Sequence, residues 1–265
     1  MSRLLALLYG TACYAVFLAT FLYAVAFVTG AGVPKHIDNG AATPTLVALA
    51  IDLALMTLFA VQHSVMARPA FKRWWTRFVP APIERSTYVL ASSLVLALLF
   101  WQWRPLQGIV WEVNGGLARG AVYVVSALGW LLVLASTFLI SHFELFGLRQ
   151  VWDLARKRAP APETPFVVRA LYRIVRHPLM LGFLIAFWAA PTMTAGHLLF
   201  AAVTTAYIIV AVKCFEERDL IAQHGEAYRR YQREVPMLLP GRVRPSRGED
   251  TAPRPHGLER GRPAR

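Results

Sequence analysis

The sequence has 265 residues, of which 56% are hydrophobic and only 16% are charged. Soluble domains carry about 25% charged residues, so the composition excludes an ordinary soluble domain and indicates an all-α, polytopic bundle of membrane helices. The formal net charge is +13. Because the arginines and lysines flank apolar segments, we expect them to orient membrane helices rather than to bind nucleic acid.

Four apolar segments of membrane-spanning length occur in the first 140 residues. They cover residues 4–28, 45–66, 86–103 and 121–140, and about 20 apolar residues cross a bilayer as a helix. The first is too long for a signal-peptide core and lacks a cleavage site, so we expect a retained helix. Trp101 and Trp103 at the end of the third predict anchors at the membrane interface. Cys13 and Cys214 lie in apolar surroundings and are predicted to be buried thiols.

A different pattern follows in the last third of the chain. Residues 179–190 are apolar but span only about 18 Å as a helix. Pro191 and Gly196 bound a turn, and a long apolar run covers residues 197–215. Proline and glycine end helices, so the pattern predicts a tight helical hairpin and brings the number of transmembrane segments to about five. Its first arm either begins before His177 or fails to cross the bilayer.

The distribution of basic residues predicts the orientation. Residues 68–85 hold five Lys and Arg, residues 141–177 hold seven, and the chain after residue 212 holds twelve, whereas residues 30–44 hold one and residues 104–119 hold two. The positive-inside rule therefore places both termini in the cytoplasm. We expect one membrane domain over residues 1–240 and, because residues 241–265 are rich in Arg, Pro and Gly, a disordered basic tail.

Arg176, His177 and Pro178 form a polar start to the hairpin, followed one turn later by Gly182. Proline suits the first turn of a helix, and free N–H groups there favour an anion. Gly182 permits close approach by a ligand or by another helix. The alternative is an ordinary interfacial helix start with a snorkelling arginine.

Two adjacent carboxylates, Glu216 and Glu217, end the last apolar run. Carboxylates at this depth are costly unless they have partners, although a solvated acidic helix end is the alternative. Neighbours on a helix lie about 100° apart, so only one of the two need face the bundle interior. The hairpin brings His177 and Glu216 to the same membrane face.

These segments carry a family resemblance. Arg176-His177-Pro178-x-x-x-Gly182, Glu216-Glu217-x-x-Leu220 and Gly225-x-x-Tyr228-x-x-Tyr231-x-x-x-Val235-Pro236 resemble the C-terminal signature of the membrane methyltransferases, which include isoprenylcysteine carboxyl methyltransferase and the phospholipid methyltransferases. The resemblance implies an S-adenosylmethionine pocket within residues 142–240. The residues it implies for that pocket are Gln150, Arg176, His177, Pro178, Gly182, Glu216, Glu217 and Tyr228. Met180 departs from the aromatic residue that this superfamily often has there.

A second resemblance spans most of the chain. The segments that carry it are Gln62-His63-Ser64, Glu84-Arg85-Ser86-Thr87-Tyr88, Trp101–Pro105, His142–Gln150, Arg176–Phe187 and Pro191–His197. They are similar to the family of bacterial methanethiol S-methyltransferases. This resemblance implies methyl transfer to methanethiol, giving dimethyl sulfide and S-adenosylhomocysteine, in the cytoplasmic membrane of a bacterium.

A thiol acceptor requires a base or a positive field, because the thiolate is the nucleophile. The candidates near the predicted cytoplasmic boundary are His63, Arg85, Tyr88, His142 and Arg149. Each also has a structural interpretation, as a packing, anchoring or lipid-binding residue. The sequence shows no spacing typical of metal ligands, so no metal is expected.

Other functions remain open at this point. The enzyme could act on another thiol, on an isoprenylated cysteine or on a lipid amine, and a membrane assembly or transport protein could retain the fold. A transporter would typically show repeated halves with broken helices, and only one break is visible. Lipid and a small volatile thiol are the expected partners, and the oligomeric state is left undetermined.

Overall fold

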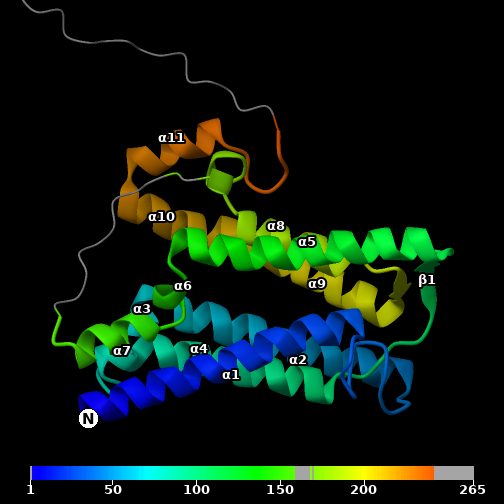
Figure 1. Ribbon diagram of the computed structural model, residues 1–265, viewed down its shortest axis with the longest axis horizontal. Helices are drawn as coiled ribbons and strands as arrows, with labels where there is room; N and C mark the ends of the chain where they lie inside the picture. Colours follow the sequence, from blue (N-terminus) through cyan, green and yellow to red (C-terminus); the bar gives the residue numbers. More distant parts are fainter. Residues whose placement is uncertain (1, 159–167, 169, 242–265) are drawn as a thin grey trace, which may run out of the picture.

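The computed structural model describes residues 2–158, 168 and 170–241 and consists almost entirely of helices (Figure 1). Within these described residues, five helical runs are long and apolar enough to cross a membrane. They are α1 (Arg3–Thr29), α2 (Thr45–Ala67), α4 (Ala81–Gln102), α5 (Gly116–Ile140) and the run Ala195–His224. The all-α membrane fold is therefore confirmed, and the predicted basic tail lies outside the described residues.

The last of these runs is not a continuous α-helix. It consists of α9 (Ala195–Ala211), a π-helical turn η2 (Val212–Glu216) and α10 (Glu217–His224). A π-turn accommodates one extra residue and occurs frequently at functional sites. Here it ends at the two glutamates that the sequence singled out.

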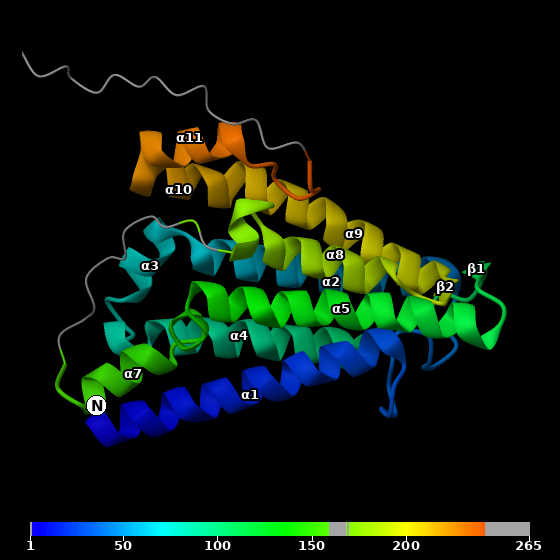
Figure 2. The same cartoon turned by 45° about the horizontal axis from the view of Figure 1, so that its top comes forward.

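Short elements gather at one end of the bundle. They are α3 (Pro69–Trp75), α6 (His142–Leu145), α7 (Leu148–Ala155), the 3₁₀ turn η1 (Ala170–Arg173) and α11 (Glu226–Glu234). Figures 1 and 2 show α3, α7, α10 and α11 at the end that holds the N-terminus, while β1 (Ile109–Glu112) and β2 (Thr192–Thr194) lie at the opposite end. We call the end with the N-terminus the basic end, because the described parts of the arginine-rich connections lie there. We call the opposite end the strand end.

The hairpin differs from the predicted turn. Its first arm, α8 (Pro178–Trp188), has 11 residues and is only about 16 Å long. Residues 192–194, expected in the turn, instead form strand β2, which pairs antiparallel with β1. Backbone outside helices is tolerated at membrane depth only when its polar groups have partners.

Those partners come from β1 and α9. Val113 N donates to Pro191 O at 2.8 Å, the Trp111 indole donates to Ala190 O at 3.0 Å, and His197 Nε2 bonds to Phe187 O at 2.9 Å. The carbonyl groups freed where α8 ends are thus hydrogen-bonded within the protein. The short arm reaches the strand end by continuing as extended chain.

Two glycines bring α5 and α8 into close contact. A Cβ atom added to Gly129 would lie 2.6 Å from Ala186 N, and one added to Gly182 would lie 2.8 Å from Gly129 O. Ser126 Oγ also donates to Ala186 O at 3.2 Å. Membrane helices associate largely through such small-residue contacts and hydrogen bonds between helices. The sequence left open whether Gly182 permits close approach by a ligand or by another helix. The structure shows that it packs closely against another helix.

Two of the sequence predictions for single residues were wrong. Trp103 is fully buried, and its indole donates to Ile37 O at 3.0 Å, because the 30–44 segment folds back over the end of α4. Trp101, which is 71% exposed, remains a candidate for the interface. Cys13 is buried as expected, but Cys214 is exposed on the π-turn.

The start of α4 also differs from the prediction. The helix begins at Ala81, with Pro82 in its first turn, and not near residue 86. Glu84 and Arg85 therefore belong to the helix. The apolar pattern alone did not include them, because this first turn lies at the polar end of the bundle.

We expect Gly129→Ala to lower the melting temperature of the detergent-solubilised protein by several degrees. The new methyl group meets backbone atoms of α8, which cannot move aside as a flexible side chain would, so the cost should be about 1–3 kcal/mol. The matched control is Gly120→Ala in the same helix, where nothing lies within 4 Å. Thermal circular dichroism measures both variants, and equal melting temperatures would contradict the assigned role of this contact.

Candidate functional site

A buried carboxylate, Glu217, organises the basic end of the hairpin. Its Oε1 accepts hydrogen bonds from Arg176 Nε at 2.8 Å and lies 3.2 Å from His177 Nε2, while its Oε2 accepts from Gln232 Nε2 at 3.0 Å. The side chains of Arg176 and Glu217 are each 11% exposed. A buried charge needs this full set of partners, because one left alone is strongly destabilising.

Arg176 also fixes the chain after α11. Its Nη1 donates to Gln232 O at 2.9 Å and to Val235 O at 2.6 Å. The backbone N–H groups of Arg176 and His177 donate to Pro236 O and Met237 O. The Arg176 guanidinium, which belongs to the predicted donor pocket, is therefore bound within the protein.

His177 joins the two glutamates. Its Nδ1 lies 3.5 Å from Glu216 Oε1, and its own side chain is almost fully buried. Burial alone would lower the pKa of His177, but the hydrogen bonds and charges of Glu216 and Glu217 outweigh it and raise that pKa to about 9. The imidazole is therefore protonated at neutral pH.

Glu216 and Glu217 differ in their surroundings. Glu217 faces the interior, whereas the Glu216 side chain is 43% exposed and, in the described part of the chain, its carboxylate forms an ion pair with His177 alone. This matches the expectation that one of the two neighbours faces inward. Glu216 is thus the carboxylate with capacity left for a ligand.

The other residues of the predicted donor pocket occupy different positions. Pro178 is buried in the first turn of α8, as expected, and Gly182 contacts α5. Tyr228 is 2% exposed and meets Tyr231 at 5.7 Å between ring centroids, in a small core beneath α10 and α11. Gln150 lies on α7, with Nε2 donating to Glu144 O at 3.1 Å and a buried Oε1 that has no hydrogen-bond partner among the described residues.

A second polar cluster lies between α2 and α4. The Tyr88 hydroxyl is 3.0 Å from each ring nitrogen of His63, and His63 Nδ1 is 3.2 Å from Ser92 Oγ. The Arg85 guanidinium stands 5.4 Å from the centroid of the Tyr88 ring. The structure thus brings together three of the five residues proposed for the thiol end.

Contacts between α2 and the last helical run connect the two clusters. Arg68 pairs with Asp219 at 2.9 Å, and its guanidinium lies 4.8 Å from the centroid of Phe215. Ser64, next to His63, bonds Tyr207 at 3.0 Å. Phe215 and Asp219 flank the two glutamates in the sequence, so these contacts join α2, which carries His63, to the helical run that carries Glu216.

His142 and Arg149 lie apart from this group. The two ring nitrogens of His142 bond Tyr14 and Thr137, each at 2.8 Å, and its ring stacks on Phe138. Arg149 forms ion pairs with Glu144 and Asp153 and is half-exposed. These partners account for both residues without a ligand.

Two cavities were not foreseen in the sequence. One of about 350 Å³ lies at the basic end. Its lining includes Lys72, Glu84, Arg85, Ser141, Glu144 and Gln150. Lys72 and Glu84 could not be singled out earlier because isolated charges near a membrane boundary are common.

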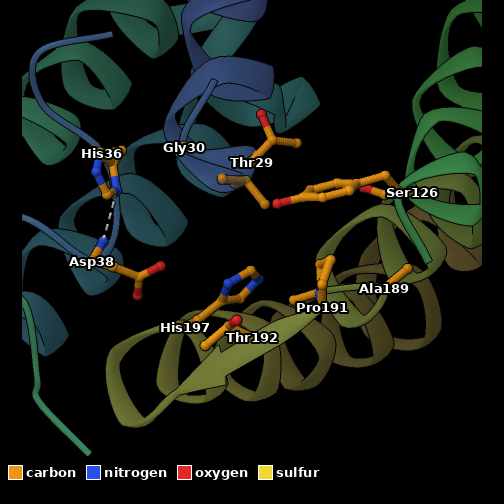
Figure 3. Close-up of a pocket in the computed structure, with 12 residues that line it drawn as sticks. Thr29, Gly30, His36, Asp38, Ser126, Ala189, Pro191, Thr192 and His197 are labelled. Carbon is orange, nitrogen blue, oxygen red and sulfur yellow. Dashed lines mark hydrogen bonds between the residues drawn. The ribbon is translucent and has the colours of Figure 1, made fainter. Parts of the chain in front are cut away.

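The other cavity, of about 190 Å³, lies at the strand end (Figure 3). Asp38 and His197 face one another across it, and Thr194 Oγ1 donates to Asp38 Oδ1 at 2.5 Å. In the part of the chain that the structure describes, no group of three or more His, Cys, Asp or Glu side chains is arranged to hold a metal ion.

The raised pKa of His177 predicts how stability depends on pH. A group whose pKa is higher in the folded than in the unfolded state stabilises the fold fully below the unfolded pKa, and this contribution disappears as the pH rises through the folded pKa. We expect the melting temperature to fall between about pH 6.5 and pH 9. The variant His177→Asn should flatten this part of the profile, whereas His36→Asn at the strand end should not. An unchanged slope in His177→Asn would contradict the assignment.

The chain matches the family model described as NnrU protein over residues 53–239. It is 56% identical to a protein of Mycobacterium tuberculosis named methanethiol S-methyltransferase, over 91% of this chain and 98% of that relative. It is 58% identical to methanethiol S-methyltransferase 1 of Bradyrhizobium diazoefficiens, over 91% of this chain and 84% of the relative.

More distant relatives include nurim of Rattus norvegicus, which is 31% identical over 71% of this chain and 73% of its own length. No solved structure matches the chain. Family membership therefore rests on sequence similarity along almost the whole described domain, including both polar clusters. This chain belongs to the NnrU protein family, as a relative of its bacterial methanethiol S-methyltransferases.

Proposed function

We propose that the protein transfers a methyl group from S-adenosylmethionine to methanethiol and releases dimethyl sulfide and S-adenosylhomocysteine. The observation that carries this proposal is identity above 50% to enzymes named for this acceptor, over about nine-tenths of the chain. The contacts of Ser64 and Arg68, at the His63 end of α2, with the helical run that carries Glu216 support it, since methyl transfer requires donor and acceptor side by side.

We place the reaction at the basic end and assign that end to the cytoplasm. The support is the positive-inside rule applied to the three arginine-rich connections, whose described parts lie there. Residues 1–240 form one membrane domain in this proposal, and its part from 142 to 240 supplies the donor pocket.

The residues present suit such a donor. S-Adenosylmethionine, when bound, supplies an electrophilic methyl group on a sulfonium ion. The half-exposed Glu216 carboxylate suits ribose hydroxyls or an ammonium group, and the buried, unpartnered Gln150 Oε1 offers a second acceptor. Glu217 and Arg176 act as positioning residues, because their contacts hold His177 and the chain after α11 around Glu216.

At the acceptor end, we propose that His63 accepts the proton of the thiol. Tyr88 and Ser92 hold its imidazole, and the nearby Arg85 guanidinium favours negative charge on the acceptor sulfur. His63 takes the S–H proton, which leaves the sulfur as a thiolate, the form that attacks carbon. The sulfur gains a methyl group as the bond between that group and the sulfonium breaks. The apolar helix surfaces around this cluster let a small thiol enter from the lipid.

The test uses purified protein in detergent with methanethiol and S-adenosylmethionine, and headspace gas chromatography of the product. Enzyme-dependent dimethyl sulfide that requires the donor is the expected result. Calorimetry with S-adenosylhomocysteine separates the alternatives. Binding without product would transfer the proposal to a larger thiol or a lipid, and folded protein that shows neither would overturn the enzyme proposal.

We expect His63→Ala to lower the turnover of this reaction by about 10²–10⁴-fold, the range for loss of a general base. Tyr88→Phe should lower it less, because it removes only the hydroxyl that orients His63. Tyr123→Phe, a hydroxyl deletion at the strand end, is the matched control and should retain wild-type turnover. Full turnover in His63→Ala would remove that residue from the mechanism.

The two glutamates should separate binding from stability. Glu216→Gln should weaken S-adenosylhomocysteine by about 10-fold or more and leave the melting temperature near that of the wild type. Glu217→Gln should lower the melting temperature, because loss of the buried charge leaves Arg176 without its counter-ion, at a cost of about 3 kcal/mol. Glu226→Gln, on exposed α11, is the control. Normal affinity in a Glu216→Ala/Glu217→Ala double variant would refute this donor site.

A further inference from the structure

The 350 Å³ cavity at the basic end carries charges of both signs. It lies between the α3–α4 corner, which supplies Lys72, Glu84 and Arg85, and the end of α5 with α6 and α7, which supply Glu144 and Gln150. Ligand pockets have volumes of about 300–1,000 Å³, whereas methanethiol has only two non-hydrogen atoms. A cavity of this size and polarity does not correspond to the thiol.

Among the described residues, two of these charges form no close ion pair. In the described part of the chain, neither the Lys72 ammonium nor the Glu84 carboxylate takes part in an ion pair or a side-chain hydrogen bond. Arg85 donates through Nε to Leu145 O at 2.9 Å, which leaves its terminal nitrogens available. Gln150 Oε1 is buried there without a hydrogen bond. Unpaired groups of opposite charge around one cavity match a ligand that carries both charges itself.

The donor proposed above carries both charges, on the α-carboxylate and the α-ammonium of its amino-acid end. In the Glu217 cluster, Arg176 is bound to Glu217 and to two carbonyl groups and cannot serve the carboxylate. Lys72 is an alternative, because it lies one turn after Arg68 at the start of α3, and Arg68 pairs at 2.9 Å with Asp219, three residues after Glu216. The cavity is thus placed to extend the donor site.

We propose that this cavity binds the amino-acid end of the methyl donor, with Lys72 and Arg85 holding its carboxylate and Glu84 and Gln150 Oε1 holding its ammonium group. The inference rests on the proposed function and adds a zwitterion subsite to which the N-terminal half of the chain contributes Lys72, Glu84 and Arg85. The nucleoside end then lies toward Glu216, on the C-terminal half.

The state of Lys72 agrees with this role. Burial, followed by the charge of Arg85, lowers the pKa of Lys72, since both oppose a second positive charge at this place. A bound carboxylate would offset both effects. The site is therefore preorganised for an anion. Preorganisation raises affinity because less ordering of the site is needed when the ligand binds.

Two ligands isolate the proposed contact. S-Adenosylhomocysteine carries the amino-acid end, whereas 5′-methylthioadenosine has the same nucleoside and a thioether but no amino acid. Calorimetry on full-length protein in detergent should show that Lys72→Ala weakens S-adenosylhomocysteine about 10-fold or more, the range for one hydrogen bond to a charged group, and leaves 5′-methylthioadenosine unchanged. Glu84→Gln should act in the same direction.

The matched control is Arg73→Ala, which removes the neighbouring exposed cation of α3 and should leave both affinities unchanged. Lys72→Arg, which keeps the charge, should recover part of the affinity and exclude a folding defect. Equal losses for both ligands, or no loss for either, would overturn the subsite while wild-type binding of S-adenosylhomocysteine upholds the proposed donor. Absence of that binding in the wild type would overturn the proposed function and this subsite with it.

Discussion

The buried carboxylate of Glu217 is the constraint on which the basic end depends. A single carboxylate joins the start of α8 through Arg176 and His177, the first turn of α10, and α11 through Gln232. Ion pairs of this kind contribute little net stability compared with an apolar core, but breaking one is expensive, so they select one arrangement over others. Here the selected arrangement leaves Glu216 at the open side of a protonated imidazole.

The two halves of the chain contribute different kinds of residues around Glu217. The C-terminal half holds the glutamates and the histidine in a closed network of charges. The N-terminal half brings His63, Tyr88 and Arg85 toward it on α2 and α4, and Arg68 connects the halves through Asp219 and Phe215. The proposed reaction, between a charged donor and an apolar thiol, benefits from this division, since one wall can be polar while the other stays open to lipid.

Most of the fold could be predicted from apolar run length and basic flanks. These signals identified the long helices and the hairpin because hydropathy reports directly on membrane burial. They missed the β1–β2 pair, which depends on a contact between residues about 80 positions apart, and they missed the burial of Trp103, which depends on the 30–44 segment folding back. Hydropathy also stopped short of Glu84 and Arg85, which belong to α4.

The site was predictable only in part, for a related reason. His177, Glu216 and Glu217 could be paired because a hairpin places its ends together. Two other features depend on how loops distant in sequence fold together. One is the binding of Arg176 to Glu217 and two carbonyl groups, and the other is the cavity that Lys72 and Gln150 both line. No local pattern encodes that arrangement. His142 and Arg149 show the converse, since their residue types suggested chemistry and their surroundings provide packing partners and ion pairs.

The glycine contact between α5 and α8 has a consequence for how a product leaves the protein. Because backbone meets backbone at Gly129 and Gly182, α8 packs against α5 without intervening side chains that could rearrange. The proposed product, S-adenosylhomocysteine, is far larger than methanethiol and needs a way out past this closely packed pair of helices. The chain after α10 is held by hydrogen bonds of Arg176, Gln232 and Tyr231 and by the small core around Tyr228. For the proposed reaction, we expect this segment to move when the product leaves, while α5 and α8 stay in place.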